Sequence, residues 1–247
     1  MRLIVNADDL GMSREVNDAT FALIDQGLIT SSTIMANAPA FEDAVHRAQE
    51  FPQVSFGVHL NLTQFAPLSD PDRLRPLLNE DGEFQNPLNL SALNRGLATA
   101  ILDEWTAQVQ RVREAGVNVS HIDSHHHVHM SWALLRVLTE LQKRLDIHRV
   151  RAPKTVFLQP MTPRLHAIRL RCLAWKRAVR TPYPTHMTDT FAEYETIHKL
   201  HVARPLRFEI AEAMVHPNHP MYADETTLLR HNAHEIPDLE RVSFWEV

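Results

Sequence analysis

Short apolar runs alternate with segments of helical periodicity along this chain. The apolar runs have the length and β-branched content of strands, and they predict strands at residues 3–5, 32–35, 54–62, 117–123, 149–151, 188–191, 212–215 and 243–247. The helical segments are 13–27, 39–50, 132–145 and 164–180, with a further helix through Trp105, Val109 and Val112. Alternation of this kind predicts parallel β/α units. Seven or eight units favour one α/β domain over 1–247, a TIM-like barrel that is distorted or incomplete.

The predicted helices carry recognisable end signals. Ser13 is a candidate N-cap, and Gly27 and Gly116 are candidate C-terminal stops. Pro39 suits a first helical turn. Residues 64–90 are instead rich in proline, aspartate and asparagine with little periodicity. We expect them to form a long loop or lid, because long loops in compact domains are often functional.

Composition narrows the class of protein. The chain has 247 residues and a formal net charge of −5, which gives no reason to expect a nucleic-acid partner. Its single cysteine, Cys172, excludes an intramolecular disulfide and fits a reducing compartment. Neither a signal peptide nor an apolar run of about 18–20 residues is seen. We expect a cytoplasmic protein with no membrane partner.

Histidine is the unusual feature of the composition. The chain has 16 histidines, and five of them fall within residues 121–129. Three predicted strands end in metal-binding residue types: the first in Asp8-Asp9, the third at His59, and the fourth in the run from Asp123 to His127. Because the C-terminal ends of barrel strands meet on one face, these side chains are predicted to converge on one site.

Two imidazoles and a carboxylate form a three-ligand set with open positions. Such a set suits Zn²⁺, Mn²⁺, Co²⁺ or Fe²⁺, whereas Mg²⁺ prefers oxygen ligands. An open position would hold water, and the second acid of the Asp8-Asp9 pair could accept its proton. An Asp-Asp pair or a lone histidine is often only a surface or structural feature. The histidine cluster is internal and follows a strand, so we favour a metal or catalytic role for it, with several members orienting the ligands.

Two further residues stand at predicted strand ends. A protonated His216 could donate to a leaving amine, although a loop histidine is an equally simple interpretation. Arg151 could hold a substrate oxygen or an acid such as Asp8, or form a surface ion pair.

Several motifs resemble one known family. The segments NADDLG (6–11), TSSTIMAN (30–37), GVHLNLT (57–63) and HIDSHHHVHM (121–130) resemble the YdjC-like carbohydrate deacetylases, which include the chitooligosaccharide (diacetylchitobiose) deacetylases. Weaker similarity continues through VRAP (150–153), TDTF (188–191) and MVHP (214–217). The resemblance therefore covers essentially the whole chain.

The resemblance implies a barrel related to the polysaccharide deacetylases and an enzyme that removes acetyl groups from N-acetylated sugars or chitooligosaccharides. It places the metal ligands at Asp9, His59 and His125, the general base at Asp8 and a candidate general acid at His216. Asp123, His127, Arg151 and Asp189 are expected to bind substrate or to support the ligands. The family is associated with Mg²⁺, whereas the ligand types favour Zn²⁺, Mn²⁺ or Co²⁺. The family, with an exposed ring expected at Trp175, also points to a homodimer.

The chain departs from the family pattern at two places. Leu10 replaces a usual phenylalanine, and Asn218, followed by His219-Pro220, replaces a usual glycine after the His-Pro pair. The second change bears on the substrate-side loop and on sugar specificity, and leaves the metal ligands intact.

Three alternative interpretations stand beside the deacetylase. One is another metal-dependent hydrolase, an amidase or phosphoesterase, on the same barrel; another is an inactive sugar-binding relative. The third concerns residues 147–188, which contain nine Lys or Arg and no acid. A basic amphipathic helix can bind membranes or nucleic acid. We favour an outer barrel helix that packs its stripe of Leu165, Ile168, Trp175 and Val179 on the sheet. A subunit interface or the rim of an anionic-substrate site is the next choice.

Overall fold

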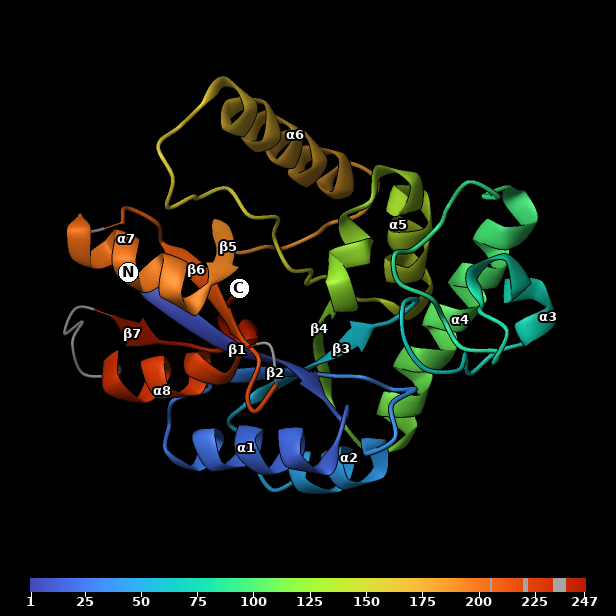
Figure 1. The fold of residues 1–247 in the computed structure, drawn as a ribbon, viewed down its shortest axis with the longest axis horizontal. Coiled ribbons are helices and arrows are strands. Elements are labelled where there is room, and N and C mark those ends of the chain that lie inside the picture. The colour runs from blue at the N-terminus through green and yellow to red at the C-terminus, as the bar shows by residue number, and fades with distance from the viewer. Residues whose placement is uncertain (205, 220–221, 233–238) are drawn as a thin grey trace.

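A curved parallel sheet with the strand order β4-β3-β2-β1-β6-β5 forms the centre of the protein, seen here as a computed structural model (Figure 1). The structure describes residues 1–204, 206–219, 222–232 and 239–247. The strands are β1 (Arg2–Leu10), β2 (Ser31–Ile34), β3 (Ser55–Leu60), β4 (Val119–Ser124), β5 (Thr190–Glu193), β6 (Ile210–Val215) and β7 (Glu240–Arg241). Every pairing between the described strands is parallel, and β7 pairs with the start of β1. The predicted incomplete barrel of β/α units is therefore confirmed.

Helices surround this sheet. They are α1 (Arg14–Asp25), α2 (Phe41–Ala48), α3 (Pro71–Leu74), α4 (Arg95–Glu114), α5 (Leu135–Leu145), α6 (Pro163–Arg180), α7 (Tyr194–Ala203) and α8 (Ala223–Asn232). Helices α1 and α2 lie along one side, α4 and α5 along another, and α7 and α8 flank β6 and β7 (Figure 1). The Ser13 hydroxyl accepts from Val16 N and caps α1 as predicted. Helices α7 and α8 were not predicted from the sequence.

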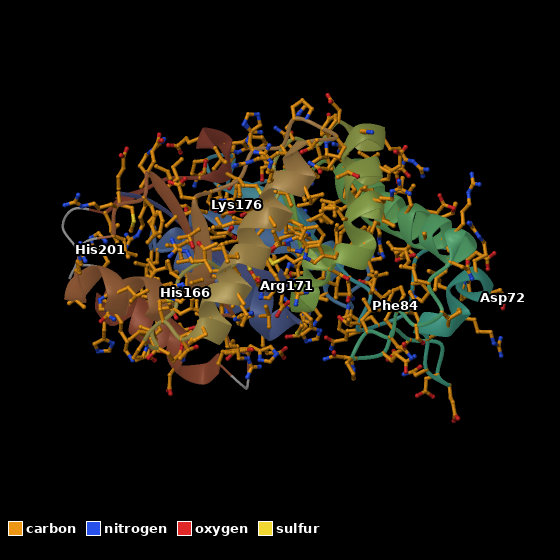
Figure 2. The ribbon with its side chains drawn as sticks, turned by 90° about the horizontal axis from the view of Figure 1, so that it is seen from above. Asp72, Phe84, His166, Arg171, Lys176 and His201 are labelled. Atoms are coloured by element: carbon orange, nitrogen blue, oxygen red, sulfur yellow. The ribbon has the colours of Figure 1, made fainter. Side chains whose placement is uncertain are left out.

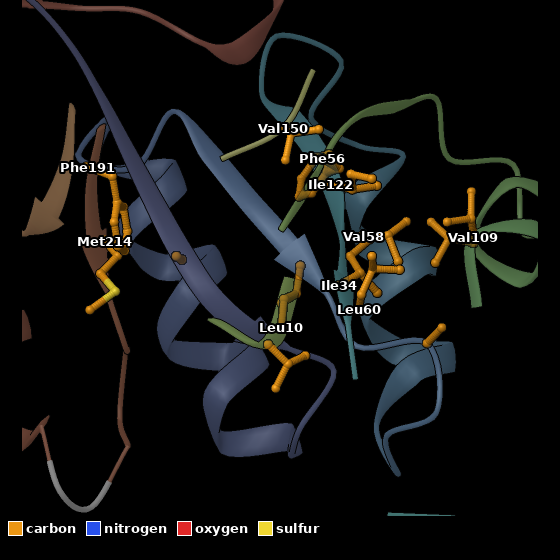
Figure 3. Close-up of a cluster of buried hydrophobic side chains, with 14 of the residues drawn as sticks. Leu10, Ile34, Phe56, Val58, Leu60, Val109, Ile122, Val150, Phe191 and Met214 are labelled. Atoms are coloured by element: carbon orange, nitrogen blue, oxygen red, sulfur yellow. The ribbon is translucent and has the colours of Figure 1, made fainter. Parts of the chain in front are cut away.

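Strand β3 shows how the fold directs side chains to two sides. Val58 and Leu60 point towards Val109 of α4 and join the hydrophobic core (Figure 3). Successive side chains on a strand alternate between faces, so Gly57 and His59 face the barrel interior. The interior residue Gly57 has His121 directly above it: a Cβ there would lie 2.6 Å from His121 Cε1. The glycine of the GVHLNLT motif therefore makes room for a buried histidine.

The gap between β4 and β5 is bridged by single residues. Val150 pairs with Ile122 of β4, and Lys154 pairs with Phe191 of β5, each as an isolated bridge. The fifth strand predicted at 149–151 therefore occupies a strand position but forms no ladder. Pro153 has no N–H to donate, which is one reason why pairing does not extend along this segment. The barrel is irregular at this point, and the buried side chain of Arg151 enters its interior.

The strand predicted at 243–247 is wrong. Phe244–Glu246 is a 3₁₀ turn that begins with a capping box between Ser243 and Glu246, a local pattern that favours a helical turn over a strand. The last strand, β7, lies just before it. The Phe244 ring stacks on His121 with 3.6 Å between the ring centroids, so the C-terminal segment covers the N-terminal end of the barrel.

The segment 64–90 is more ordered than the predicted loop. It contains α3 and a 3₁₀ turn, and it buries Leu74, Leu77 and Phe84. The Glu104 carboxylate of α4 accepts hydrogen bonds from Leu68 N and Ser69 N. The segment is thus anchored on α4, and a role as a lid stays a prediction.

Only the C-terminal half of helix α6 packs against the rest of the protein. Trp175, Lys176 and Val179 are buried, whereas Leu170 and Leu173 are 67% and 45% exposed. Figure 2 shows His166, Arg171 and Lys176 along this helix. The expected exposure of Trp175 is wrong, because its side chain is 2% exposed. Trp175 therefore gives no support to a homodimer. Among the described residues, no helix is long and apolar enough to cross a membrane.

Candidate metal centre and active site

The end of β1 brings two adjacent carboxylates into the barrel. The β1–β2 register shifts between Ala7 and Leu10, and Asp9 has a φ of 65°. A left-handed conformation is uncommon for a residue other than glycine and costs on the order of 1–3 kcal/mol. The kink interrupts the alternation of side chains along the strand. Asp8 and Asp9 are therefore both buried and both face the same site, as predicted for a strand end.

His59 is fixed in register with an acid on the next strand. His59 of β3 pairs with Asp123 of β4, and its Nδ1 lies 2.7 Å from Asp123 Oδ1. Thr33 of the neighbouring strand β2 contacts both His59 Nδ1 and Asp123 Oδ2, each at 3.1 Å. The proton on Nδ1 is thereby held by Asp123, so Nε2 is the ring nitrogen that can bind a metal.

His125 approaches the same point from a strained turn. It begins the 3₁₀ segment His125–Met130, and the next two residues, His126 and His127, have φ of 51° and 54°. His126 Nδ1 lies 2.9 Å from Thr63 Oγ1, and His125 Nε2 lies 3.1 Å from Gln64 Oε1. These contacts from the segment after β3 hold the strained turn, and they turn His125 Nδ1 towards Asp9.

The three predicted ligands meet at Asp9 Oδ1. This oxygen lies 3.2 Å from His59 Nε2 and 2.9 Å from His125 Nδ1. It is buried, and within the described part of the chain it has no partner in hydrogen-bond geometry. Ligand atoms of these three residues all lie within 4.8 Å of one another. One carboxylate and two imidazole nitrogens, with second nitrogens bonded elsewhere, fit a divalent transition metal.

A buried arginine holds the other acids. Arg151 Nη1 and Nη2 each lie 2.6 Å from an oxygen of Asp8, and Nη1 also lies 2.7 Å from Asp123 Oδ2. Nε donates to Glu212 Oε1 at 2.6 Å. Burial opposes ionisation of Asp8, but the Arg151 guanidinium overrides it and holds the pKa of Asp8 well below its usual range. Asp8 is therefore an ionised carboxylate in the barrel interior.

The buried charges shift two further groups. Burial, with the neighbouring charges of Asp123 and Asp8, raises the pKa of Glu212 to about 8 against the opposing effect of Arg151. Burial opposes protonation of His59, but Asp123, Asp9 and Asp8 together raise its pKa to about 10. The carboxylates therefore favour positive charge at this point of the barrel, as a proton on His59 or as a metal ion.

His216 lies at the end of β6, next to β1 in the sheet. Glu225 Oε2 of α8 accepts from His216 N at 2.6 Å and lies 3.2 Å from His216 Nδ1. The Tyr222 ring stacks on the His216 ring with 4.3 Å between centroids. Burial lowers the pKa of His216, but Glu225, Asp8 and Asp9 together raise it above its ordinary value. His216 is thereby favoured as a cation near the carboxylates.

Two residues that were expected to bind substrate or to support the ligands, His127 and Asp189, have other contacts in the structure. His127 lies edge-on to Phe191 with 5.2 Å between ring centroids, and burial followed by the Arg151 charge lowers its pKa to about 3. It is a neutral neighbour of the arginine cluster. Asp189 is not brought to the site: its Oδ2 accepts from Glu209 N and Ile210 N at the start of β6, at the opposite end of the barrel.

Sequence reasoning missed four residues that shape the site: Thr33, Gln64, Glu212 and Glu225. Thr33 lies in the motif TSSTIMAN, and Gln64 directly follows the motif GVHLNLT. Glu212 lies in a predicted strand. These positions in the sequence could have marked the three residues as candidates for the site. Glu225 lies on an unpredicted helix, nine residues after His216. No local pattern indicated its contact.

The fold and this cluster of two imidazoles with buried carboxylates define a half-barrel protein with a candidate metal centre. A family model described as YdjC-like protein matches residues 2–242, and this chain belongs to that family. A carbohydrate deacetylase of Listeria monocytogenes is 30% identical over 98% of this chain and 90% of its own length. A carbohydrate deacetylase of Halalkalibacterium halodurans is 37% identical over 60% of this chain, and the match spans 62% of that relative.

The fold is shared with a solved structure. It is an Enterococcus faecalis protein provisionally named for cellobiose-phosphate cleavage, and it superposes with a TM-score of 0.76 and 22% identity over 99% of this chain and 98% of its own. The two chains therefore share a fold although few of their residues are identical.

Proposed function

We propose that this protein is a metal-dependent carbohydrate deacetylase that removes an acetyl group from an N-acetylated sugar. The observation that carries the proposal is the meeting of His59 Nε2 and His125 Nδ1 at Asp9 Oδ1, beside the second buried carboxylate of Asp8. The relatives named carbohydrate deacetylase support the reaction class. The donor set of one oxygen and two nitrogens favours Zn²⁺, Mn²⁺ or Co²⁺, while the family resemblance suggests Mg²⁺.

Asp9, His59 and His125 would hold the ion. A divalent ion held there would supply Lewis-acid polarisation of the acetyl carbonyl and of water. Asp8 accepts the proton of the water that attacks the acetyl carbon. Arg151 keeps the Asp8 carboxylate ionised and in place through two short hydrogen bonds.

His216 is suited to the second proton transfer. Its Nδ1 contacts Glu225, so Nε2 is the nitrogen left to donate to the departing amine when the C–N bond breaks. Transfer of one proton from water to Asp8 and another from His216 to nitrogen gives acetic acid, which ionises to acetate in solution, and a free amine. An N-acetylated sugar, and no nucleic acid, is the expected partner.

The proposal is tested by acetate release from N,N′-diacetylchitobiose and a panel of N-acetyl sugars. Metal-stripped protein receives Zn²⁺, Mg²⁺, Mn²⁺ or Co²⁺ separately. We expect release that requires metal and that is lost in Asp9→Ala. Protein that binds metal but releases no acetate from any sugar would overturn the proposed reaction. Turnover of a generic phosphate ester by the same samples would then favour a phosphoesterase, and saturable sugar binding without turnover a binding protein.

A further inference from the structure

Gln64 contacts a proposed metal ligand from outside the barrel. It follows β3 and begins the segment 64–90. Its Oε1 lies 3.1 Å from His125 Nε2, while the other ring nitrogen of His125 lies 2.9 Å from Asp9 Oδ1. An amide oxygen only accepts hydrogen bonds. The proton of His125 therefore belongs on Nε2, and the lone pair of Nδ1 faces the metal site.

Two asparagine amides hold the backbone of Gln64 in place. Its carbonyl oxygen accepts from Asn61 Nδ2 at 2.6 Å and from Asn37 Nδ2 at 3.2 Å. Asn61 is itself held by Gln108, whose Oε1 accepts from Asn61 N at 2.8 Å. The next residue, Phe65, has a φ of 62°. The chain thus turns sharply just after a residue whose backbone is fixed by hydrogen bonds. The fixed backbone directs the Gln64 side chain towards His125.

The two histidines of the site are oriented by different chemistry. His59 donates to the carboxylate of Asp123, whereas His125 donates to a neutral amide. A carboxylate acceptor adds negative charge behind its ligand, and an amide acceptor fixes the ring without adding charge. An amide acceptor selects the tautomer of His125 without adding to the negative charge of Asp8 and Asp9.

We propose that Gln64 is a positioning residue that selects Nδ1 of His125 for the metal and thereby sets the metal affinity of the site. Gln64 also ties the segment 64–90 to the metal ligand. This inference rests on the proposed function, because it takes His125 as a ligand. Its test measures metal binding directly and does not depend on finding the substrate.

The test compares Gln64→Leu, which removes the acceptor and keeps the volume, with Gln64→Glu, which offers only acceptors. Dissociation constants are measured for Zn²⁺ by competition with a chromophoric chelator, and the visible spectrum of the Co²⁺ form reports the ligand geometry. We expect Gln64→Leu to weaken Zn²⁺ binding by about 10–100-fold, as for other groups that orient metal ligands. Gln64→Glu should restore binding to within a few-fold of the parent and keep the Co²⁺ spectrum.

Two controls separate this role from others. Gln85→Ala changes a half-buried glutamine of the same segment and should leave Zn²⁺ binding unchanged. His125→Ala should remove tight binding. Parent-like affinity in Gln64→Leu, with binding lost in His125→Ala, would overturn the role of Gln64 and leave the metal centre intact. Equal weakening in the Leu and Glu variants would also overturn it, because Glu retains the acceptor. Unchanged binding in His125→Ala would overturn the proposed metal centre as well.

Discussion

His59 and Asp123 occupy paired positions on β3 and β4, and His59 Nδ1 lies 2.7 Å from Asp123 Oδ1. Strand register therefore places a carboxylate directly behind one proposed metal ligand. The acid fixes the tautomer of the imidazole and orients its other nitrogen towards Asp9. The pair shows how a parallel sheet can assemble a metal site from residues far apart in the chain.

Asp123→Ala should weaken metal binding by about 10–100-fold, because His59 loses the acceptor that orients it. Binding of Zn²⁺ is measured for Asp123→Ala, His59→Ala and the double variant. If Asp123 acts through His59, the double variant binds no more weakly than His59→Ala alone. Additive losses in the double variant would argue that Asp123 acts independently of His59.

Asp8→Asn should retain bound metal and lose about 10²–10⁴-fold in kcat, because an amide cannot accept the proton of water. Metal content and acetate release are measured on the same preparation. The thermal midpoint is also recorded, because the variant weakens an ion pair with Arg151. A fully active Asp8→Asn protein would exclude Asp8 as the general base.

Glu212 should make the metal-free protein less stable as pH rises. Burial raises its folded-state pKa to about 8, from 4.5 in the unfolded chain. Between these values the folded state holds a proton that the unfolded state has lost, so the free energy of unfolding falls by on the order of 1 kcal/mol per pH unit. Below the lower value both states are protonated and the effect disappears.

Glu212→Gln should remove this dependence, since a glutamine can still accept from Arg151 and does not titrate. Denaturant unfolding of both proteins at pH 6 and pH 8, with a chelator present, measures the difference. The variant should lose less stability than the parent between these pH values. Identical slopes in the two proteins would show that Glu212 does not titrate in this range.

Glu225→Gln should shift the alkaline limb of the activity profile to lower pH. As general acid, His216 must be protonated, so activity falls as pH rises through its pKa. Burial opposes protonation of His216, and the contact with Glu225 raises its pKa above the ordinary value. Loss of the Glu225 charge should move the midpoint of the alkaline limb to lower pH by about one unit. The measurement is the pH profile of kcat. If the alkaline limb does not move, His216 supported by Glu225 is not the general acid.

Gly57→Ala should destabilise the protein, because a Cβ would lie 2.6–2.8 Å from His121 Cε1, Nδ1 and carbonyl oxygen. Overpacking of this kind costs about 1–3 kcal/mol. Thermal unfolding is compared with Gly96→Ala in the first turn of α4, where alanine has the higher helix propensity. We expect a lower midpoint only for Gly57→Ala; equal midpoints in both variants would show that His121 can move aside.

The sequence by itself determined the class of fold and the three proposed ligands. Apolar runs and helical periodicity are local properties, so β1, β3 and β4 were recognisable together with the acids and histidines at their ends. The rule that parallel strands end on one face then predicted that Asp9, His59 and His125 would meet. The family motifs selected Asp9 and His125 among their neighbours.

Only the tertiary structure decided which side chains support these ligands. The contacts of Arg151 with Asp8, Asp123 and Glu212 join four segments, and no spacing in the chain specifies them. The left-handed φ of Asp9, the approach of Gln64 to His125 and the contact of Glu225 with His216 arise from how the segments pack. Asp189 shows the reverse case: a motif residue that the fold places at the opposite end of the barrel. Local sequence sets the propensity of each element, whereas the distances between side chains of different elements depend on sheet register and barrel curvature.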